Sequence, residues 1–128
     1  MLISCSYGEI LDKLTILEIK LSKCLDEDKK RNIQNEYNGL CEHKKDDDVF
    51  IDLYNKLKDI NHKLWDCEDA IRLKSQKKEF DEDYILISEN IHTYNDRRYE
   101  IKKEINKTYN SFIIEEKFYN IKSTPIIE

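Results

Sequence analysis

Residues 50–71 read FIDLYNKLKDINHKLWDCEDAI, and residues 84–105 read YILISENIHTYNDRRYEIKKEI. In both stretches, side chains at alternating steps of three and four residues form one stripe along a helix, and that stripe is almost wholly apolar. The first stripe consists of Phe50, Leu53, Leu57, Ile60, Leu64, Cys67 and Ile71, and the second consists of Tyr84, Ile87, Ile91, Tyr94, Arg98, Ile101 and Ile105. We therefore predict a long helical hairpin that turns near Phe80 and buries one stripe against the other.

The composition also favours an all-α protein. Of the 128 residues, 38% are charged, while only 2 are glycine and 1 is proline, which is typical of long helices with charged surfaces and not of a turn-rich β protein. This length suits one domain over residues 1–128. We expect an antiparallel helical bundle of about four helices and a short C-terminal segment.

Charge, cysteine usage and hydropathy exclude several classes of function. The formal net charge of -5 argues against a general nucleic-acid binder, and no apolar run is long enough to cross a bilayer. The four cysteines contain no C-x-x-C pair, and we expect no secretory leader. These features predict reduced thiols and a cytoplasmic protein that does not contact membranes.

Charged residues mark the expected helix boundaries. Ser6 and Glu9 have capping-box spacing, so the first helix should begin near Tyr7. Acidic residues at an expected start and basic residues at an expected end then predict a second helix over residues 27–45, a third that begins at 46–48 and a fourth that begins at 81–83. Within the second, Asn38-Gly39 is a point where the helix can end early. Residues 120–128 are expected to form a loose tail.

The first helix is apolar on more than one side. Its stripe contains Ile10, Leu14, Leu17, Leu21 and Cys24, and four further residues, Leu11, Ile16, Ile19 and Leu25, widen the apolar surface. Such a helix is normally central. We expect it to pack on the hairpin along one side and on the second helix or a second subunit along another, which favours a homo-oligomer.

Arg98 is the one charge in either stripe of the hairpin. A guanidinium at such a position needs a carboxylate or phosphate partner, or must extend out of the core. One hypothesis is a structural ion pair with Asp59 or with a carboxylate of the first helix. The other is an anion-binding site, for which the candidate residues are Lys13, Trp65, Arg72, Asn95, Arg98 and Tyr99.

Two pairs of acidic residues have the i, i+3 spacing that places both carboxylates on one helix face. They are Glu9 with Asp12, and Asp66 with Asp69. Bundle proteins use such pairs to hold Mg²⁺ or Mn²⁺, so these four residues are the candidate metal ligands and Mg²⁺ is the candidate cofactor. The alternative is ordinary ion pairing with nearby lysine and arginine residues.

Four segments carry a resemblance to a known family. They are residues 8–21 (GEILDKLTILEIKL), 64–72 (LWDCEDAIR), 95–98 (NDRR) and 115–119 (EEKFY). In these segments the chain resembles an uncharacterised family of short helical proteins from bacteria and their viruses. The resemblance implies a helical fold and directs attention to Glu9, Asp12, Lys13, Trp65, Asp69, Arg72, Asn95 and Arg98, but it implies no activity.

Three functions remain open from the sequence. The first is non-catalytic binding of a small anionic, nucleotide-like molecule, with sequestration of a host signalling nucleotide in the host cytoplasm if the protein is viral. The second is an enzyme similar to the all-α nucleotide pyrophosphatases, whose paired carboxylates hold Mg²⁺. The pairs in this chain, Glu9-x-x-Asp12 and Asp66-x-x-Asp69, depart from the usual pattern of those enzymes. The third is a structural oligomer or adaptor without a small ligand.

Overall fold

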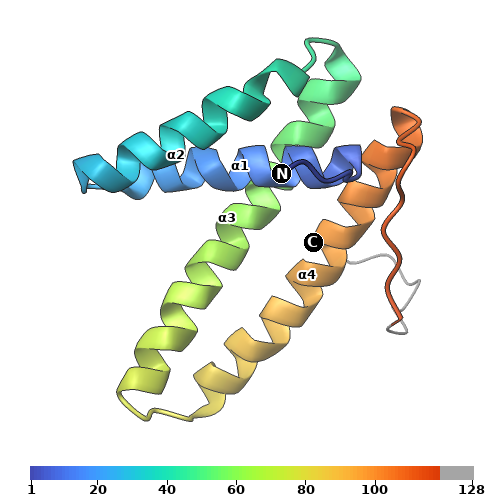
Figure 1. The fold of residues 1–128 in the computed structure, drawn as a ribbon. Coiled ribbons are helices and arrows are strands. Elements are labelled where there is room, and N and C mark those ends of the chain that lie inside the picture. Colours follow the sequence, from blue (N-terminus) through green and yellow to red (C-terminus); the bar gives the residue numbers. More distant parts are fainter. Residues whose placement is uncertain (119–128) are drawn as a thin grey trace.

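The computed structural model describes residues 1–118 and is helical, as the sequence predicts. The elements of this part of the chain are α1 (Tyr7–Lys23), α2 (Glu27–Leu40), the short 3₁₀ helix η1 (Cys41–His43), α3 (Asp48–Gln76) and α4 (Glu82–Thr108). The two longest helices, α3 and α4, are joined by a short turn at one end, and α1 crosses them near the other end with α2 beside it (Figure 1). The tail predicted for residues 120–128 lies outside the described residues.

Side-chain caps start all four α-helices. The Ser6 hydroxyl accepts a hydrogen bond from the Glu9 amide at 3.1 Å, and the carboxylates of Asp26, Asp47 and Asp81 accept hydrogen bonds from amides of α2, α3 and α4. These caps satisfy amides that have no partner within the helix. A capping box would also have the Glu9 carboxylate accept a hydrogen bond from the Ser6 amide. In the structure the Glu9 carboxylate accepts one from the Lys102 ammonium instead.

The second helix is shorter than the predicted span of residues 27–45. It ends at Leu40 and is followed by η1, which places its end beside Gly39, where the sequence allows an early stop. Glycine costs about 1 kcal/mol in a helix interior, and α2 has no buried residue whose packing would offset that cost.

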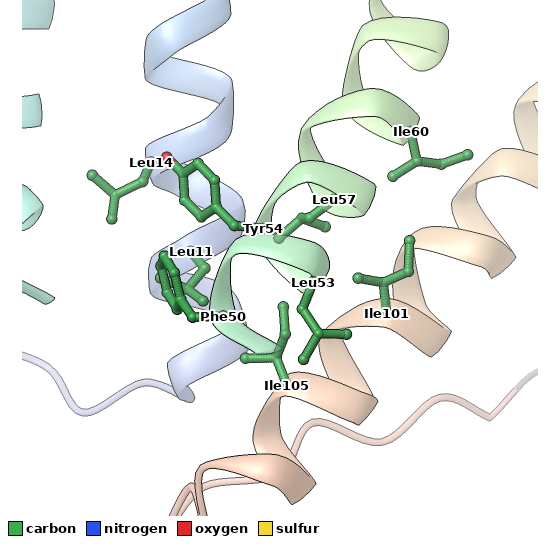
Figure 2. Packing of buried hydrophobic residues seen from close by; sticks show 9 residues of the cluster. All are labelled: Leu11, Leu14, Phe50, Leu53, Tyr54, Leu57, Ile60, Ile101 and Ile105. Carbon is green, nitrogen blue, oxygen red and sulfur yellow. The ribbon is translucent and has the colours of Figure 1, made fainter. Parts of the chain in front are cut away.

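The core lies where α1 crosses the hairpin. Figure 2 shows the buried residues Leu11, Leu14, Phe50, Leu53, Tyr54, Leu57, Ile60, Ile101 and Ile105 pointing toward one another from α1, α3 and α4. Four of these, Leu11, Leu14, Leu57 and Ile105, are 0% exposed. The helix α1 contacts α2, α3 and α4, so the prediction that the first helix is central is confirmed.

The apolar stripes of the hairpin are buried over only part of their length. We call residues 48–64 of α3 and 98–108 of α4 the covered half, and residues 65–76 and 82–97 the uncovered half. In the uncovered half Cys67 and Ile71 are only partly buried, while Leu73, Phe80, Ile85 and Leu86 in and near it are at least half exposed. The stripes are therefore fully buried only where α1 covers the hairpin, and α1 does not reach as far as the turn (Figure 1).

Gly8 sets how closely α1 approaches α4. Its amide donates a 2.7 Å hydrogen bond to the side-chain oxygen of Asn106. A Cβ atom at Gly8 would lie 2.7 Å from the backbone oxygen of Lys102, a separation at which one helix would have to move. Glycine therefore allows the start of α1 to contact the backbone of α4, and this contact positions the polar residues of the next two turns.

No helix in residues 1–118 is both long enough and apolar enough to span a lipid bilayer.

Candidate functional site

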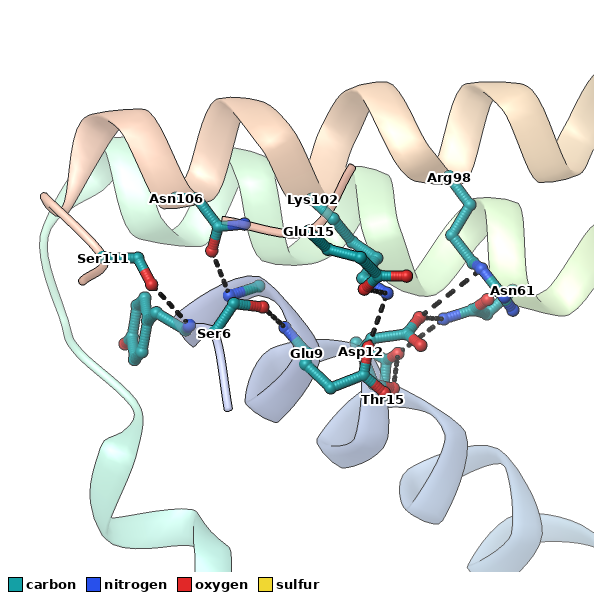
Figure 3. A network of polar contacts seen from close by, with 12 residues as sticks. Ser6, Glu9, Asp12, Thr15, Asn61, Arg98, Lys102, Asn106, Ser111 and Glu115 are labelled. Carbon is teal, nitrogen blue, oxygen red and sulfur yellow. Dashed lines mark hydrogen bonds and ion pairs between the residues drawn. The ribbon is translucent and has the colours of Figure 1, made fainter. Parts of the chain in front are cut away.

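A buried polar network lies where α1, α3 and α4 meet (Figure 3). Asp12 and Thr15 come from α1, and Asn61 comes from α3; all three are at most 4% exposed. The Asn61 side-chain amide donates 2.8 Å hydrogen bonds to the Asp12 carboxylate and to the Thr15 hydroxyl. The Thr15 hydroxyl in turn donates to the backbone oxygen of Asp12 at 2.7 Å. The network therefore fixes the position of a buried carboxylate.

Arg98 lies at the edge of this network. Its Nε atom is 4.0 Å from the Asp12 carboxylate, and its side chain is 33% exposed, against 6% for Asp12. Asp59, the other partner that the sequence suggested, lies 3.5 Å from Lys63 instead. Arg98 is thus paired with a carboxylate of the first helix, on its inner side, while about a third of its side chain remains accessible.

Lys102, one turn along α4 from Arg98, lies among three carboxylates. Its Nζ atom is 2.6 Å from Glu9 and 3.4 Å from Glu115. Burial alone would lower the pKa of the Lys102 ammonium, but the hydrogen bond to Glu9 and the charges of Asp12, Glu9 and Glu115 outweigh burial and raise this pKa. The same hydrogen bond lowers the pKa of Glu9. Both groups are therefore charged at neutral pH.

A groove of about 470 Å³ begins at Arg98 and follows α3 toward the turn of the hairpin. It is lined by one residue of α1, six of α3 and one of α4, namely Ile16, Asn61, Leu64, Trp65, Glu68, Asp69, Arg72 and Arg98. This volume lies within the range of sites that bind small molecules. The groove combines an apolar patch with charges of both signs.

The charged residues of the groove differ in their contacts. The Nε atom of Arg72 lies 3.5 Å from Glu68, and both side chains are exposed, at 76% and 48%. Exposed pairs of this kind contribute little to stability and exchange partners easily. Asp69 makes no ion pair or hydrogen bond with another side chain in residues 1–118. The groove thus contains one weakly held cation and one carboxylate without a partner in that part of the chain.

The structure brings together three of the six predicted ligand-binding residues, Trp65, Arg72 and Arg98, all of which line the groove. The other three lie elsewhere. Lys13 pairs with Glu36 of α2 at 2.9 Å. Tyr99 is buried, and the Lys117 ammonium lies 5.1 Å from the centroid of its ring. Asn95 is half-buried on α4 and does not line the groove.

The four candidate metal ligands do not come together. Glu9 pairs with Lys102 and Asp12 pairs with Arg98, so cations of the chain itself neutralise the first pair. Asp66 and Asp69 are both exposed on α3, and of the two only Asp69 lines the groove. Within residues 1–118, no group of three or more His, Cys, Asp or Glu side chains is placed to hold a metal ion.

The groove and network also contain residues that the candidate set omits. Ile16, Leu64, Asn61 and Glu68 line the groove, and Asn106 holds Gly8. The signal for the two asparagines was available: Asn61 follows the stripe residue Ile60, and Asn106 follows Ile105. A polar residue next to a stripe position faces a third helix when one covers the hairpin, and such a buried group needs a hydrogen-bonding partner.

The comparison with known families agrees with the resemblance found in the sequence. A model of a family of unknown function, DUF6165, matches residues 1–127. The chain belongs to this family. No curated protein and no solved structure matches it. The match therefore confirms the resemblance to an uncharacterised family, and it assigns no function to the groove.

Proposed function

We propose that this protein is a non-catalytic binding protein for a small anionic, nucleotide-like molecule, and that the groove beside Arg98 is its binding site. As the sequence suggested, the place of action would be the cytoplasm, or the host cytoplasm if the protein is viral, where binding would sequester a signalling nucleotide. The proposal rests mainly on one observation: Arg98 lines the groove while buried Asp12 holds it from the inner side.

The Asp12–Arg98 pair supports anion binding through preorganisation. Asp12 is fixed by the Asn61 amide at 2.8 Å and lies 4.0 Å from the Arg98 Nε atom, so its charge favours positions of the guanidinium beside the groove before a ligand arrives. An ordered arginine loses less entropy when it binds an anion than a mobile one does. Its planar fork has several N–H donors, so a contact to Asp12 through Nε is compatible with donation of other N–H groups to a phosphate.

The rest of the groove supports a ligand with a ring. Trp65, with Ile16 and Leu64, supplies an apolar surface next to Arg98, and tryptophan stacks on flat rings. Arg72 lines the same groove and is held only by an exposed pair with Glu68, so it can turn toward a hydrogen-bond acceptor on the part of the ligand that lies farther from Arg98. A phosphate joined to an aromatic ring fits this arrangement better than a bare anion does.

Isothermal titration calorimetry with a panel of nucleoside mono- and diphosphates in EDTA tests the proposal. We expect at least one to bind, and we expect Arg72→Met to weaken its binding about tenfold through loss of a charge-assisted hydrogen bond. Arg31→Met, on α2, is the matched control. Arg31 is similarly exposed and lies 3.6 Å from the carboxylate of Asp28, and this pair is not part of the groove. Absence of binding across the whole panel would refute the proposal.

The alternative of an Mg²⁺-dependent pyrophosphatase-like enzyme has less support in the geometry. Its carboxylates would have to include Glu9 and Asp12, which are paired with Lys102 and Arg98. Release of pyrophosphate from a nucleoside triphosphate that requires Mg²⁺ and is lost in Asp69→Asn would establish the enzyme and remove the sequestering function.

The second part of the proposal is that the protein forms a homo-oligomer. A structural oligomer or adaptor without a small ligand is the alternative to the binding function. The observation that favours association is the apolar surface of the uncovered half, where Leu73, Ile85 and Leu86 are 51–56% exposed. A second copy of the chain would bury these side chains. Light scattering after size-exclusion chromatography should give more than one subunit, and Leu86→Asp should shift the mass toward that of the monomer. An oligomer that binds no nucleotide would be the adaptor.

A further inference from the structure

Asp69 is the residue of the groove that the proposed function does not use. Its carboxylate lines the groove and has no side-chain partner in residues 1–118. A carboxylate close to a bound phosphate would repel it. If the groove binds an anion, Asp69 must therefore lie away from the phosphate and contact another part of the ligand.

The spacing along α3 gives the order of contacts. Asn61, Trp65 and Asp69 are at successive steps of four residues in one helix, so they follow one another along nearly one face, about 6 Å apart at a rise of about 1.5 Å per residue. Asn61 contacts Asp12, the residue that holds Arg98. The groove thus runs from a cationic end, past an indole ring, to a carboxylate about 12 Å from Asn61 along the helix axis.

The carboxylate end selects for hydrogen-bond donors. An ionised carboxylate accepts hydrogen bonds through two oxygens and donates none. It therefore matches a ring whose outer edge presents two adjacent N–H donors. Among the common bases, guanine has this edge, in its N1–H and 2-amino groups. Adenine and cytosine place a ring nitrogen lone pair beside their amino group, and uracil has one N–H between two carbonyl oxygens.

We propose that Asp69 makes the groove selective for a guanine nucleotide, an inference that rests on the proposed function. The phosphate binds at Arg98, the base stacks on Trp65, and its N1–H and 2-amino groups donate to Asp69. Glu68 is the less suitable acceptor, because it is already paired with Arg72.

Titration of the full-length protein with GMP, IMP, AMP and orthophosphate in EDTA tests this selectivity. IMP keeps N1–H and lacks only the 2-amino group, so GMP should bind about 10–100-fold more tightly than IMP, the effect of one hydrogen bond to a charged acceptor. In Asp69→Asn this preference should fall to a fewfold at most, because an amide offers one acceptor where guanine needs two. Asp66→Asn is the matched control, since Asp66 is exposed on the same helix outside the groove, and it should keep the preference.

The outcomes separate this inference from the proposed function. Equal affinities for GMP, IMP and AMP would overturn the guanine preference and leave anion binding intact. A preference for GMP that persists in Asp69→Asn would remove Asp69 as its cause and would also overturn the inference. Absence of binding by all four probes, and by the wider nucleotide panel, would refute the proposed function itself.

Discussion

The covered and uncovered halves of the hairpin have the same sequence pattern and different structures. In the covered half the stripe residues Leu57 and Ile105 are 0% exposed, whereas in the uncovered half the stripe residues Cys67, Ile71 and Ile87 are only partly buried. Both halves are built from apolar residues at steps of three and four. The difference arises because α1 packs across one half only (Figure 1).

This comparison separates two consequences of a seven-residue repeat. The repeat pairs α3 with α4 along their length, but two helices alone shield only the narrow surface between them. A third helix is needed to form a core, and it also buries polar groups that two helices would leave in water. The network of Asp12, Thr15 and Asn61 therefore lies in the covered half, and the groove opens where α1 no longer covers α3.

The largest expected effect is on packing. Leu57→Ala removes a side chain that is 0% exposed, whereas Leu73→Ala removes one that is 51% exposed. In dilute, monomeric protein we expect Leu57→Ala to lower the free energy of unfolding by about 2–5 kcal/mol and Leu73→Ala to lower it by about 0.5 kcal/mol or less. Urea denaturation followed by circular dichroism measures both. Similar losses in the monomer would contradict the difference between the halves, whereas an added loss for Leu73→Ala at concentrations where the protein associates is what the proposed oligomer predicts.

The next effect concerns the contact between α1 and α4. In Gly8→Ala the new Cβ would lie 2.7 Å from the Lys102 backbone oxygen. Because backbone atoms cannot move aside as a side chain can, we expect the free energy of unfolding to fall by about 3 kcal/mol, the upper end of typical overpacking costs.

Gly39→Ala is the control for this substitution. No atom lies within 4 Å of the position of its Cβ, and Gly39 is within α2, so alanine should raise the free energy of unfolding by up to about 1 kcal/mol. Thermal denaturation of the two variants should give melting temperatures that move in opposite directions. A neutral Gly8→Ala would show that α1 does not pack so closely on α4.

A smaller effect is expected from the buried network. Asn61→Ala removes both 2.8 Å hydrogen bonds that its amide donates to Asp12 and Thr15. Since this leaves a buried carboxylate with fewer partners, we expect a loss of about 2 kcal/mol in the free energy of unfolding. Asn55→Ala, at an exposed position of α3, should change it by about 0.5 kcal/mol or less. Chemical denaturation distinguishes the two, and equal effects would argue against the network.

The sequence predicts the helix starts and the central place of the first helix, but not the angle at which that helix crosses the hairpin. Helix starts were predictable, because caps such as Asp47 and Asp81 act within a few residues of the chain. The central place of the first helix was also predictable from its wide apolar surface. The angle at which it crosses the hairpin was not, because that angle depends on the contact between Gly8 and the backbone of α4, which no periodicity encodes.

The candidate site was predictable in part for a similar reason. Arg98 stood out because it is the one charge in either stripe, while Trp65 and Arg72 lie in segment 64–72, which carries the family resemblance, and all three line the groove. The sequence could not show that Lys13 lies outside the groove, because a lysine on the first helix can face either the hairpin or α2. In the structure Lys13 pairs with Glu36 of α2. The direction in which Lys13 points depends on how α1 is rotated about its axis, and tertiary packing fixes that rotation.

The smallest expected effect compares the pH dependence of two carboxylates: Glu18 of α1, which contacts the covered half, and Asp81, which precedes α4 beside the uncovered half. Glu18 accepts hydrogen bonds from the Tyr54 hydroxyl and, at 3.0 Å, from the Lys58 ammonium. Burial alone would raise the pKa of Glu18, but these bonds and Lys44 outweigh it and lower the pKa below its ordinary value of 4.5. Because the folded pKa is the lower one, the stabilisation is present above pH 4.5 and is lost as the pH falls through the folded value.

Glu18→Gln removes this titration and replaces the charged acceptor of the Tyr54 and Lys58 hydrogen bonds with a neutral one. It should lower the free energy of unfolding by about 1 kcal/mol at neutral pH, with little difference from the unsubstituted protein in strong acid. Beside the uncovered half, the Asp81 carboxylate lies 3.0 Å from Lys74 of α3. Its pKa is lowered by the hydrogen bond from the Tyr84 amide and by Lys74, but water and salt screen this exposed pair. Asp81→Asn, which keeps a capping oxygen, should therefore change the dependence of stability on pH less than Glu18→Gln does. Chemical unfolding measured from neutral pH into acid tests this difference. A larger effect of Asp81→Asn would contradict the distinction between the halves, because the carboxylate that α1 does not cover would then be the better shielded one.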